Sequence, residues 1–311
     1  LTWKIQTVSG KSKVIENLCN KIMDVSTKSF QIDQQRTLPR EVIRAGKNVI
    51  EVMLRFKTKL GQCEGVVRLY EDQERKGYFK AWCLLTALSD LSSSDKKNNE
   101  QYQNVLEGPN WLDKRNEDRL YKNREPEVIV VGSGQAGLSI AARLKQQNID
   151  TLIVDKNERI GDNWRNRYHS LKLHNQTLVN HLPYMPFPST WPTYIPKDKL
   201  AGWFEYYVES MELNVWTNTK FIGAEYDENK KYWKVKLKLS DDTIKIMKPK
   251  HIVMAVGVSS VPNRTKIPGM DHYKGKVIHS ADYDNGKHYN GKNILVYGTG
   301  TSAHDVAQDL Y

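Results

Sequence analysis

Gly132, Gly134 and Gly137 lie in the sequence GSGQAG, which follows an apolar run and precedes a helix-like stretch. In such a strand-turn-helix unit the first glycine permits a tight bend, the second lets a diphosphate approach the backbone, and the third brings the helix close to the strand. The first N–H groups of the helix then face the phosphates. Asp155 ends the next apolar run and can accept hydrogen bonds from the ribose hydroxyls.

A similar sequence returns near the end of the chain. NILVYGTGTSA contains Gly298 and Gly300, with Ala303 at the position of the third glycine. Two such turns in one chain indicate two dinucleotides, and a flavin with a nicotinamide is the pair that exchanges electrons. A lone GxGxxG sequence is a weak signal. Here the preceding strand, the following helix, the acidic residue and the second copy agree, so we favour this interpretation over glycines that serve turns alone.

The remaining composition excludes several other chemistries. Cys19, Cys63 and Cys83 form no CxxC pair and have no histidine at metal-ligand spacing, so we expect neither a thiol relay nor a metal. The net charge is +11, but the lysines are scattered, so we expect no nucleic-acid partner. No run is apolar enough to span a bilayer, and the N-terminal stretch carries charges. We therefore expect a soluble, cytoplasmic protein without a membrane segment.

The elements that position the first turn form a βαβ unit. Residues 128–131 are an unbroken apolar run, typical of a strand buried on both faces of a parallel sheet, and residues 138–147 have the pattern of a helix packed on it. Residues 151–155 predict the next strand, and residues 220–254 predict a β-meander that leads into an apolar strand. Around the second turn, residues 292–297 predict a strand and the residues that follow predict a helix. The sequence ends at Tyr311 before that unit is complete, so we expect only part of a second domain.

The N-terminal third predicts a separate α+β domain. An amphipathic helix over residues 12–25 precedes strands over residues 48–59, 64–72 and 77–91. Residues 1–10 also have a strand pattern, and the missing initiator methionine leads us to expect that this domain begins before residue 1. Residues 92–104 are polar and without periodicity, which favours a linker.

The sequences ERIGDNWRNRYHSLKLHNQ and HLPYMPFPSTWPTYIPKDKL, taken with the two glycine turns, resemble flavin-containing monooxygenases, most closely the YUCCA-like branch of plants and fungi. Between the turns, YKGKVIHSADY is similar to the family fingerprint F-x-G-x-x-x-H-x-x-x-F/Y, with Tyr273 in place of the leading Phe. Its last residue, Tyr283, is typical of this class, because Baeyer–Villiger monooxygenases have Trp there. The resemblance covers about residues 126–311, and residues 1–91 are similar to the cone-shaped domain of nuclear transport factor two.

The resemblance implies an α/β flavoprotein with two dinucleotide-binding domains, Rossmann-like and incomplete at the C-terminus, preceded by a small α+β cone-like domain. The expected division is an α+β domain at 1–91, a linker at 92–125, an FAD-binding domain with a β-meander at 126–260, and a connection with the start of an NADPH-binding domain at 261–311.

The implied reaction is that of a flavin monooxygenase. NADPH reduces FAD, O2 forms a flavin hydroperoxide, and one oxygen passes to nitrogen or sulfur of a small substrate, or to a carbonyl carbon in YUCCA-type oxidative decarboxylation. A reductase that uses FAD and NAD(P)H without oxygenation, and a non-catalytic flavin-binding or interaction protein, stay open as alternatives. So does a homo-oligomer.

The resemblance also suggests the site residues. His174 occupies the position where many members have an Asn near the reactive flavin carbon, with Asn175 beside it, and we predict both as catalytic. A histidine acts as acid or base near neutral pH, and a buried structural histidine is the alternative. We interpret Arg167 as a surface residue. The predicted cofactor contacts are Gly132, Gly134, Gln135, Ala136, Gly137, Asp155, Lys156, Arg159, Asn163, Trp164, Arg165, Gly257, His279, Tyr283, Gly298, Gly300, Ser302 and Ala303.

Overall fold

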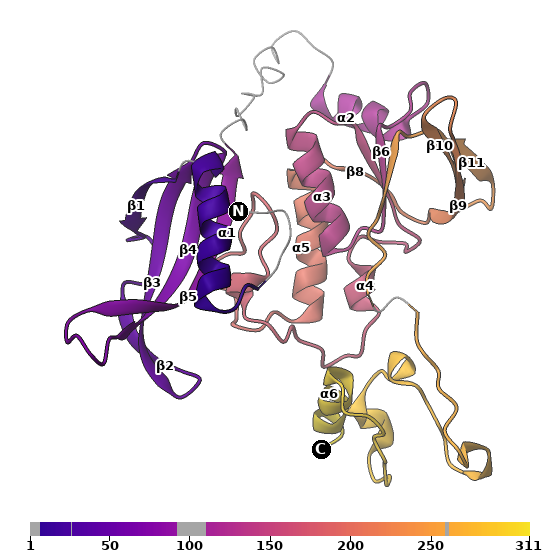
Figure 1. The fold of residues 1–311 in the computed structure, drawn as a ribbon. Helices are drawn as coiled ribbons and strands as arrows, with labels where there is room; N and C mark the ends of the chain where they lie inside the picture. Colours follow the sequence, from indigo (N-terminus) through magenta and orange to yellow (C-terminus); the bar gives the residue numbers. More distant parts are fainter. Residues whose placement is uncertain (1–6, 26, 92–109, 259–260) are drawn as a thin grey trace. The chain divides into compact units, whose positions relative to one another are not determined.

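The computed structural model describes residues 7–25, 27–91, 110–258 and 261–311. The chain divides into two compact units, unit 1 (residues 1–108) and unit 2 (residues 109–311) (Figure 1). The first six residues of the predicted N-terminal strand and the polar sequence 92–104 lie outside the described residues.

Unit 1 contains one helix and an antiparallel sheet. The strand order is β1-β3-β4-β5, and β2 pairs with β3. The predicted helix and the three longer strands are confirmed. The two short strands β1 and β2, of sequence KSFQI and REVIR, were not predicted because largely exposed five-residue segments with several polar side chains have little periodicity. The elements are α1 (Lys11–Val25), β1 (Lys28–Ile32), β2 (Arg40–Arg44), β3 (Lys47–Thr58), β4 (Gly61–Glu71) and β5 (Phe79–Leu91).

A buried carboxylate joins three strands of this sheet. Glu51 on β3 is only 4% exposed, and its Oε2 accepts a 2.8 Å hydrogen bond from Nε of Arg68 on β4. Arg40 and Arg44 on β2 approach Oε1 at 3.2 and 3.4 Å. The hydrogen bond from Arg68 outweighs burial and lowers the pKa of Glu51 below its ordinary value. The carboxylate is therefore ionised at neutral pH and stabilises the sheet.

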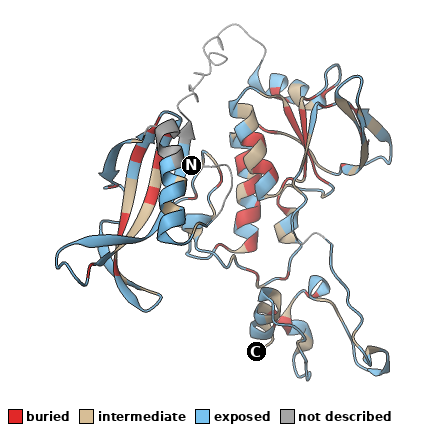
Figure 2. Cartoon of the chain, in the orientation of Figure 1, coloured by how far each residue is buried: buried red, intermediate tan, exposed pale blue. Residues whose placement is uncertain are grey.

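The centre of unit 2 is a parallel sheet in the order β12-β6-β7-β8. Every residue of β6 and β7 is buried (Figure 2). One face packs against α3 and α5 through Val130, Leu138 and Phe204, and the other packs against the meander through Ile129 and Val235. The predicted βαβ unit and meander are confirmed. The elements are β6 (Val128–Val131), α3 (Gln135–Gln146), β7 (Thr151–Val154), α5 (Lys197–Ser210), β8 (Asn214–Trp216), β9 (Lys220–Asp227), β10 (Tyr232–Lys238), β11 (Ile244–Met247) and β12 (His251–Met254).

Part of the predicted linker is a helix. Helix α2 (Trp111–Leu120) begins at Asn110, whose side chain accepts a 2.8 Å hydrogen bond from the Leu112 N–H. Arg115 is buried, and its guanidinium donates to Asn214 Oδ1 at 2.9 Å and to the Leu213 carbonyl at 3.2 Å. The linker prediction is therefore wrong for residues 111–120, because polar bonds to β8 rather than an apolar face attach this helix to unit 2.

The predicted strand at residues 292–297 is also wrong. This segment has no strand partner in the described part of the chain, and Leu295 and Tyr297 are 88% and 78% exposed. An apolar run becomes a strand only where a neighbouring strand accepts and donates its hydrogen bonds. The helix predicted after it is present as α6 (Thr301–Leu310).

Helix α6 is attached to the rest of unit 2 by a small core. Its Val306 packs with Tyr168, Leu171 and Tyr283, all of which are buried. This core places the second glycine turn beside residues 164–174, although the two segments are far apart in the sequence. The short helices of these regions are α4 (Asp162–Arg165), η3 (Thr177–Val179), η4 (Met270–His272), η5 (Ser280–Asp282) and η6 (Gly286–Tyr289).

Candidate functional site

Two glycines of the first turn are required by backbone contacts. Gly132 has φ +107°, and a Cβ on it would lie 2.5 Å from the carbonyl oxygen of Ala255, just after β12. A Cβ on Gly137 would overlap the carbonyl oxygen of Gly132. Helix α3 therefore starts in direct contact with the end of β6, as a dinucleotide-binding turn requires.

Gly134 differs from these two because space lies beside it. Its φ is −76°, and a Cβ would meet only Asn163 Nδ2, at 3.3 Å. No side chain caps the start of α3, and the N–H groups of Gln135 and Ala136 have no acceptor in the described residues. An uncapped helix start behind an open glycine fits a diphosphate.

Asp155 supports the turn from the end of β7. Its Oδ2 accepts hydrogen bonds from both the N–H and the hydroxyl of Ser133, each at 2.7 Å, and its Oδ1 accepts from the Asn157 N–H at 2.9 Å. The side chain is 8% exposed, whereas Lys156 beside it is exposed. Oδ2 uses both lone pairs on Ser133, but Oδ1 accepts only one hydrogen bond, so Asp155 can still accept from a ribose hydroxyl through Oδ1.

The segment after β7 contains four predicted cofactor contacts, and only two of them lie at the glycine turn. Asn163 lies beside Gly134, and Trp164 Nε1 donates to Gln135 Oε1 at 3.3 Å. The two arginines have other partners. Arg159 Nη2 lies 2.9 Å from Glu205 Oε1 on α5, and Arg165 Nη2 lies 2.7 Å from Glu205 Oε2. Arg165 also bonds to Asp162 and to the Ile160 carbonyl. The structure thus places the amide and the indole at the turn and the arginines in internal ion pairs.

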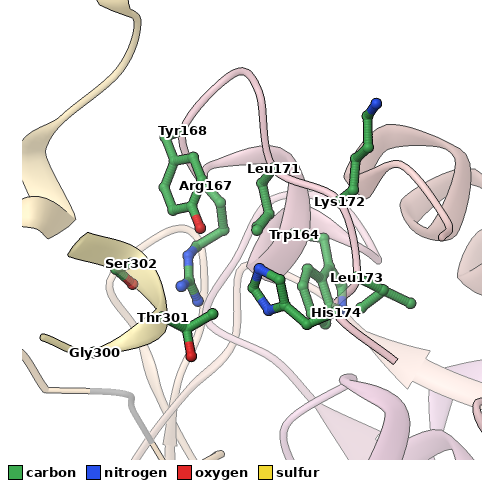
Figure 3. Close-up of a pocket in the computed structure, with 10 residues that line it drawn as sticks. All are labelled: Trp164, Arg167, Tyr168, Leu171, Lys172, Leu173, His174, Gly300, Thr301 and Ser302. Carbon is green, nitrogen blue, oxygen red and sulfur yellow. The ribbon is translucent and has the colours of Figure 1, made fainter. Parts of the chain in front are cut away.

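A cavity of about 340 Å³ lies where this segment meets the start of α6. Trp164 and His174 line one part of it, and Gly300 and Ser302 line another (Figure 3). Arg167 lines it as well, with its guanidinium directed toward the start of α6 and without a side-chain partner in the described residues. Arg167 is exposed, as predicted, but no feature of the sequence indicates that it lines a cavity, since only the packing of α6 brings it there. The full lining is Trp164, Arg167, Tyr168, Leu171, Lys172, Leu173, His174, Gly300, Thr301 and Ser302.

The second turn shares two features with the first, a glycine at positive φ and an uncapped helix start. Gly298 has φ +142°, and Gly300 precedes α6 without a side-chain cap in the described residues. A Cβ on Gly298 would lie 3.7 Å from Cβ of Ala303, which is ordinary contact. The looser approach explains why alanine is accommodated here, where the first turn needs Gly137.

The two predicted catalytic residues are separated. His174 is 50% exposed and lines the cavity, with Nε2 2.8 Å from Asp305 Oδ2 on α6. It is therefore not a buried structural histidine. Asn175 is exposed and does not line the cavity, and its carbonyl oxygen accepts a 3.1 Å hydrogen bond from Asn180 Nδ2.

The fingerprint residues hold the connection to α6. His279 Nδ1 accepts from the Ala281 N–H at 3.0 Å, and the hydroxyl of buried Tyr283 donates to Asp309 Oδ2 at 2.6 Å. Burial, and then Asp309, raise the pKa of Tyr283. Neither residue lines the cavity. Gly257, after β12, has φ +82° and nothing within 4 Å of a built Cβ, so the bend of the backbone, rather than crowding, favours glycine there.

A parallel sheet ends in one uncapped glycine turn, and a second such turn lines a cavity with Trp164, which bonds to the first turn. This arrangement is that of a flavoprotein fold with two dinucleotide-binding turns. The chain belongs to the pyridine nucleotide-disulphide oxidoreductase family, whose sequence model matches residues 129–311.

Curated relatives include the probable indole-3-pyruvate monooxygenase YUCCA3 of Arabidopsis thaliana, 32% identical over 188 residues that cover 59% of this chain and 43% of the relative. The indole-3-pyruvate monooxygenase YUCCA1 of Oryza sativa is 30% identical over 186 residues, covering 60% and 45%. This chain therefore spans less than half the length of these relatives.

Solved structures support the fold. A variant flavin monooxygenase from Stenotrophomonas maltophilia and the S-allyl-L-cysteine S-oxygenase from Allium sativum each align with a TM-score of 0.55 at 20% identity over 60% of this chain, covering 54% and 48% of theirs. The bacillithiol disulfide reductase from Bacillus cereus aligns with a TM-score of 0.52 at 20% identity, covering 60% of this chain and 55% of its own. None of the helices in the described residues has the length and apolar character needed to cross a membrane.

Proposed function

We propose that this protein is a flavin-dependent monooxygenase that uses FAD and NADPH. The observation that carries the proposal is the pair of uncapped glycine turns, of which the second lines a cavity together with Trp164, whose indole bonds to Gln135 of the first. The names of the curated relatives support oxygenation, and indole-3-pyruvate enters as a candidate substrate for that reason. Amines and sulfides are the other substrates proposed from the family resemblance.

The residues present fit FAD at the first turn. Gly134 leaves space for the diphosphate at the start of α3, and Asp155 offers Oδ1, which accepts only one hydrogen bond within the protein, to the ribose. Asn163 and Trp164 border the same space. When bound, FAD supplies the redox chemistry, accepting electrons from NADPH and passing them to O2.

The start of α6 suits the second dinucleotide. Gly300 has open space around it, and Ser302 offers a hydroxyl beside the helix start. Arg167 adds a cation that makes no ion pair in the described part of the chain. A guanidinium matches two phosphate oxygens in one plane, so Arg167 is suited to a diphosphate.

The cavity wall also provides a proton-carrying group and an apolar surface. His174 lies among Trp164, Leu171 and Leu173. Apolar neighbours limit the access of water to the reacting atoms, and a histidine can hold or release a proton near neutral pH. We therefore assign proton transfer to His174 and the exclusion of water to the three apolar side chains.

A reductase without oxygenation is the second candidate because a disulfide reductase has the same fold. Reduction of a disulfide through protein thiols needs a cysteine pair beside the flavin. Cys19, Cys63 and Cys83 are all in unit 1, and residues 109–311 contain no cysteine. This distribution favours oxygenation over thiol chemistry.

The proposal is tested with the chain loaded with FAD. We expect NADPH to bleach the flavin absorbance without O2, and then, with 18O2 and indole-3-pyruvate, an amine or a sulfide, a product labelled with 18O. Gly300→Ala should keep FAD but lose bleaching, because its Cβ would occupy the second phosphate space without contacting protein atoms. Bleaching followed only by peroxide with every substrate would identify a reductase, and a flavin that NADPH never bleaches would leave a non-catalytic protein.

A further inference from the structure

Asp305 on α6 contacts two side chains from the segment after β7. Its Oδ2 accepts a hydrogen bond from the hydroxyl of Tyr168 and lies 2.8 Å from His174 Nε2. Asp305 is 22% exposed, so this carboxylate is partly removed from water. Tyr168 and His174, from one loop, thus share Oδ2 of Asp305 on the helix that follows the second glycine turn.

The positions of the protons follow from this geometry. Burial first, and then Asp305, raise the pKa of Tyr168, so its hydroxyl keeps its proton and donates it. An ionised carboxylate has only acceptor positions. For His174 to bond to the same oxygen, Nε2 must carry a proton. Nδ1 is then the ring nitrogen left for the cavity, and it has no hydrogen-bond partner in the described residues.

We propose that Asp305 is a positioning residue that fixes the orientation and tautomer of His174, so that Nδ1 is the atom presented to the substrate. Tyr168 supports Asp305 by holding the shared oxygen in place. The effect on turnover rests on the proposed function, whereas the tautomer itself does not. Because His174 follows the first dinucleotide turn and Asp305 follows the second, the reactive geometry forms only where α6 is docked.

A second carboxylate on the same helix provides a matched control. Asp309 lies one turn after Asp305 and accepts from the Tyr283 hydroxyl at 2.6 Å and the Gly286 N–H at 2.9 Å. Its contacts hold α6 to the fingerprint segment and include no contact with His174. Asp305→Ala and Asp309→Ala therefore each remove one charge and one tyrosine partner from α6, but only the first removes the acceptor of His174.

The experiment is NMR of the whole chain with 15N-labelled histidine, without flavin, with His174→Asn to assign the signal. We expect the wild-type ring to be protonated at Nε2 and unprotonated at Nδ1, with an Nε2 proton that exchanges slowly with water. Asp305→Ala should lose that slow exchange and Asp309→Ala should keep it. A wild-type ring protonated at Nδ1, or slow exchange that persists in Asp305→Ala, overturns the proposal, and the first of these needs no variant to fold.

The catalytic consequence is measured with FAD bound. Asp305→Ala should lower kcat for oxygenation by about 10- to 100-fold, because a mispositioned acid-base group loses part of its contribution. The KM for NADPH should change less than about twofold, since the phosphates contact other residues. A raised KM with an unchanged kcat overturns the positioning role. A chain that binds no FAD would contradict the proposed function. The NMR experiment would still determine the tautomer of His174, because it is done without flavin.

Discussion

Arg165 and Arg167 lie two residues apart in one loop and have different environments. Arg165 is 19% exposed and is bonded to Asp162 and Glu205, whereas Arg167 lines the cavity with its guanidinium unpaired in the described residues. One arginine therefore stabilises the loop around α4, and the other is available to an anionic ligand.

Replacing each arginine with glutamine separates these roles. Arg167→Gln should raise the KM for NADPH by about 10- to 100-fold, the loss expected for a charged hydrogen bond of about 1.5–3 kcal/mol, with an unchanged Tm. Arg165→Gln should lower the Tm instead, because it leaves Glu205 and Asp162 with fewer partners. Steady-state kinetics and thermal unfolding measure both effects. An unchanged KM in Arg167→Gln would contradict the assignment of this cation to the dinucleotide.

The site residues that sequence predicts best are those with a local backbone reason. Gly132, Gly137 and Asp155 belong to a turn whose geometry is determined within one βαβ unit. Arg167 and Asp305 escaped prediction because each depends on the docking of α6 against a segment more than a hundred residues earlier. No periodicity or spacing in a single sequence records such a contact.

At the level of elements, the two glycine turns differ in how closely helix and strand approach. A Cβ at residue 137 would overlap the Gly132 carbonyl, whereas residue 303 carries a Cβ that lies 3.7 Å, an ordinary contact distance, from a Cβ built on Gly298. The first turn is thus the tighter one, and its third glycine cannot be exchanged without moving α3.

Gly137→Ala should therefore destabilise unit 2 by about 1–3 kcal/mol, the usual cost of overpacking a close contact. Ala303→Gly should cost no more than about 1 kcal/mol, through the lower helix propensity of glycine. Urea unfolding monitored by tryptophan fluorescence measures both. Equal losses in the two variants would show that the first turn is not tighter than the second.

Elements with an apolar period and a covering partner were predicted correctly, a helix held by polar bonds was missed, and an apolar run without a pairing strand was predicted wrongly. Residues 128–131 and 151–154 are strands because both faces are covered. Helix α2 was missed because buried Arg115 attaches it, and residues 292–297 were predicted as a strand although nothing in the described chain pairs with them.

For the molecule as a whole, the family assignment is shown for one unit and predicted for the other. The family match covers unit 2 from residue 129 onward, and the resemblance of residues 1–91 to nuclear transport factor two stays a prediction. In unit 1 the buried carboxylate of Glu51 is held by arginines, and its lowered pKa makes the stability of unit 1 depend on pH.

Because the folded-state pKa of Glu51 lies below its unfolded value of about 4.3, its contribution is complete above that value and is lost as pH falls through the lowered pKa. Glu51→Gln should destabilise unit 1 by about 1.5–3 kcal/mol at pH 7 and remove this part of the pH dependence. Hydrogen exchange of the β3 amides measures it. Glu64→Gln, which removes a more exposed pair with Arg36, should cost less than about 1 kcal/mol. A greater loss of unfolding free energy in Glu64→Gln than in Glu51→Gln would contradict the stabilising role of Glu51.

The most direct test of the account is FAD uptake by three forms of the chain, measured by visible absorbance after gel filtration. Gly134→Ala adds a Cβ that meets only a flexible amide in the protein, and Gly202→Ala adds one to open space on α5. We predict about one bound FAD per chain for the wild type and for Gly202→Ala, and none for Gly134→Ala. The Tm of the Gly134→Ala apoprotein should equal that of the wild type, and that of Gly202→Ala should be slightly higher because alanine has the higher helix propensity. A colourless wild type, or a Gly134→Ala variant that retains FAD as the wild type does, would contradict the claim that this turn holds the flavin diphosphate.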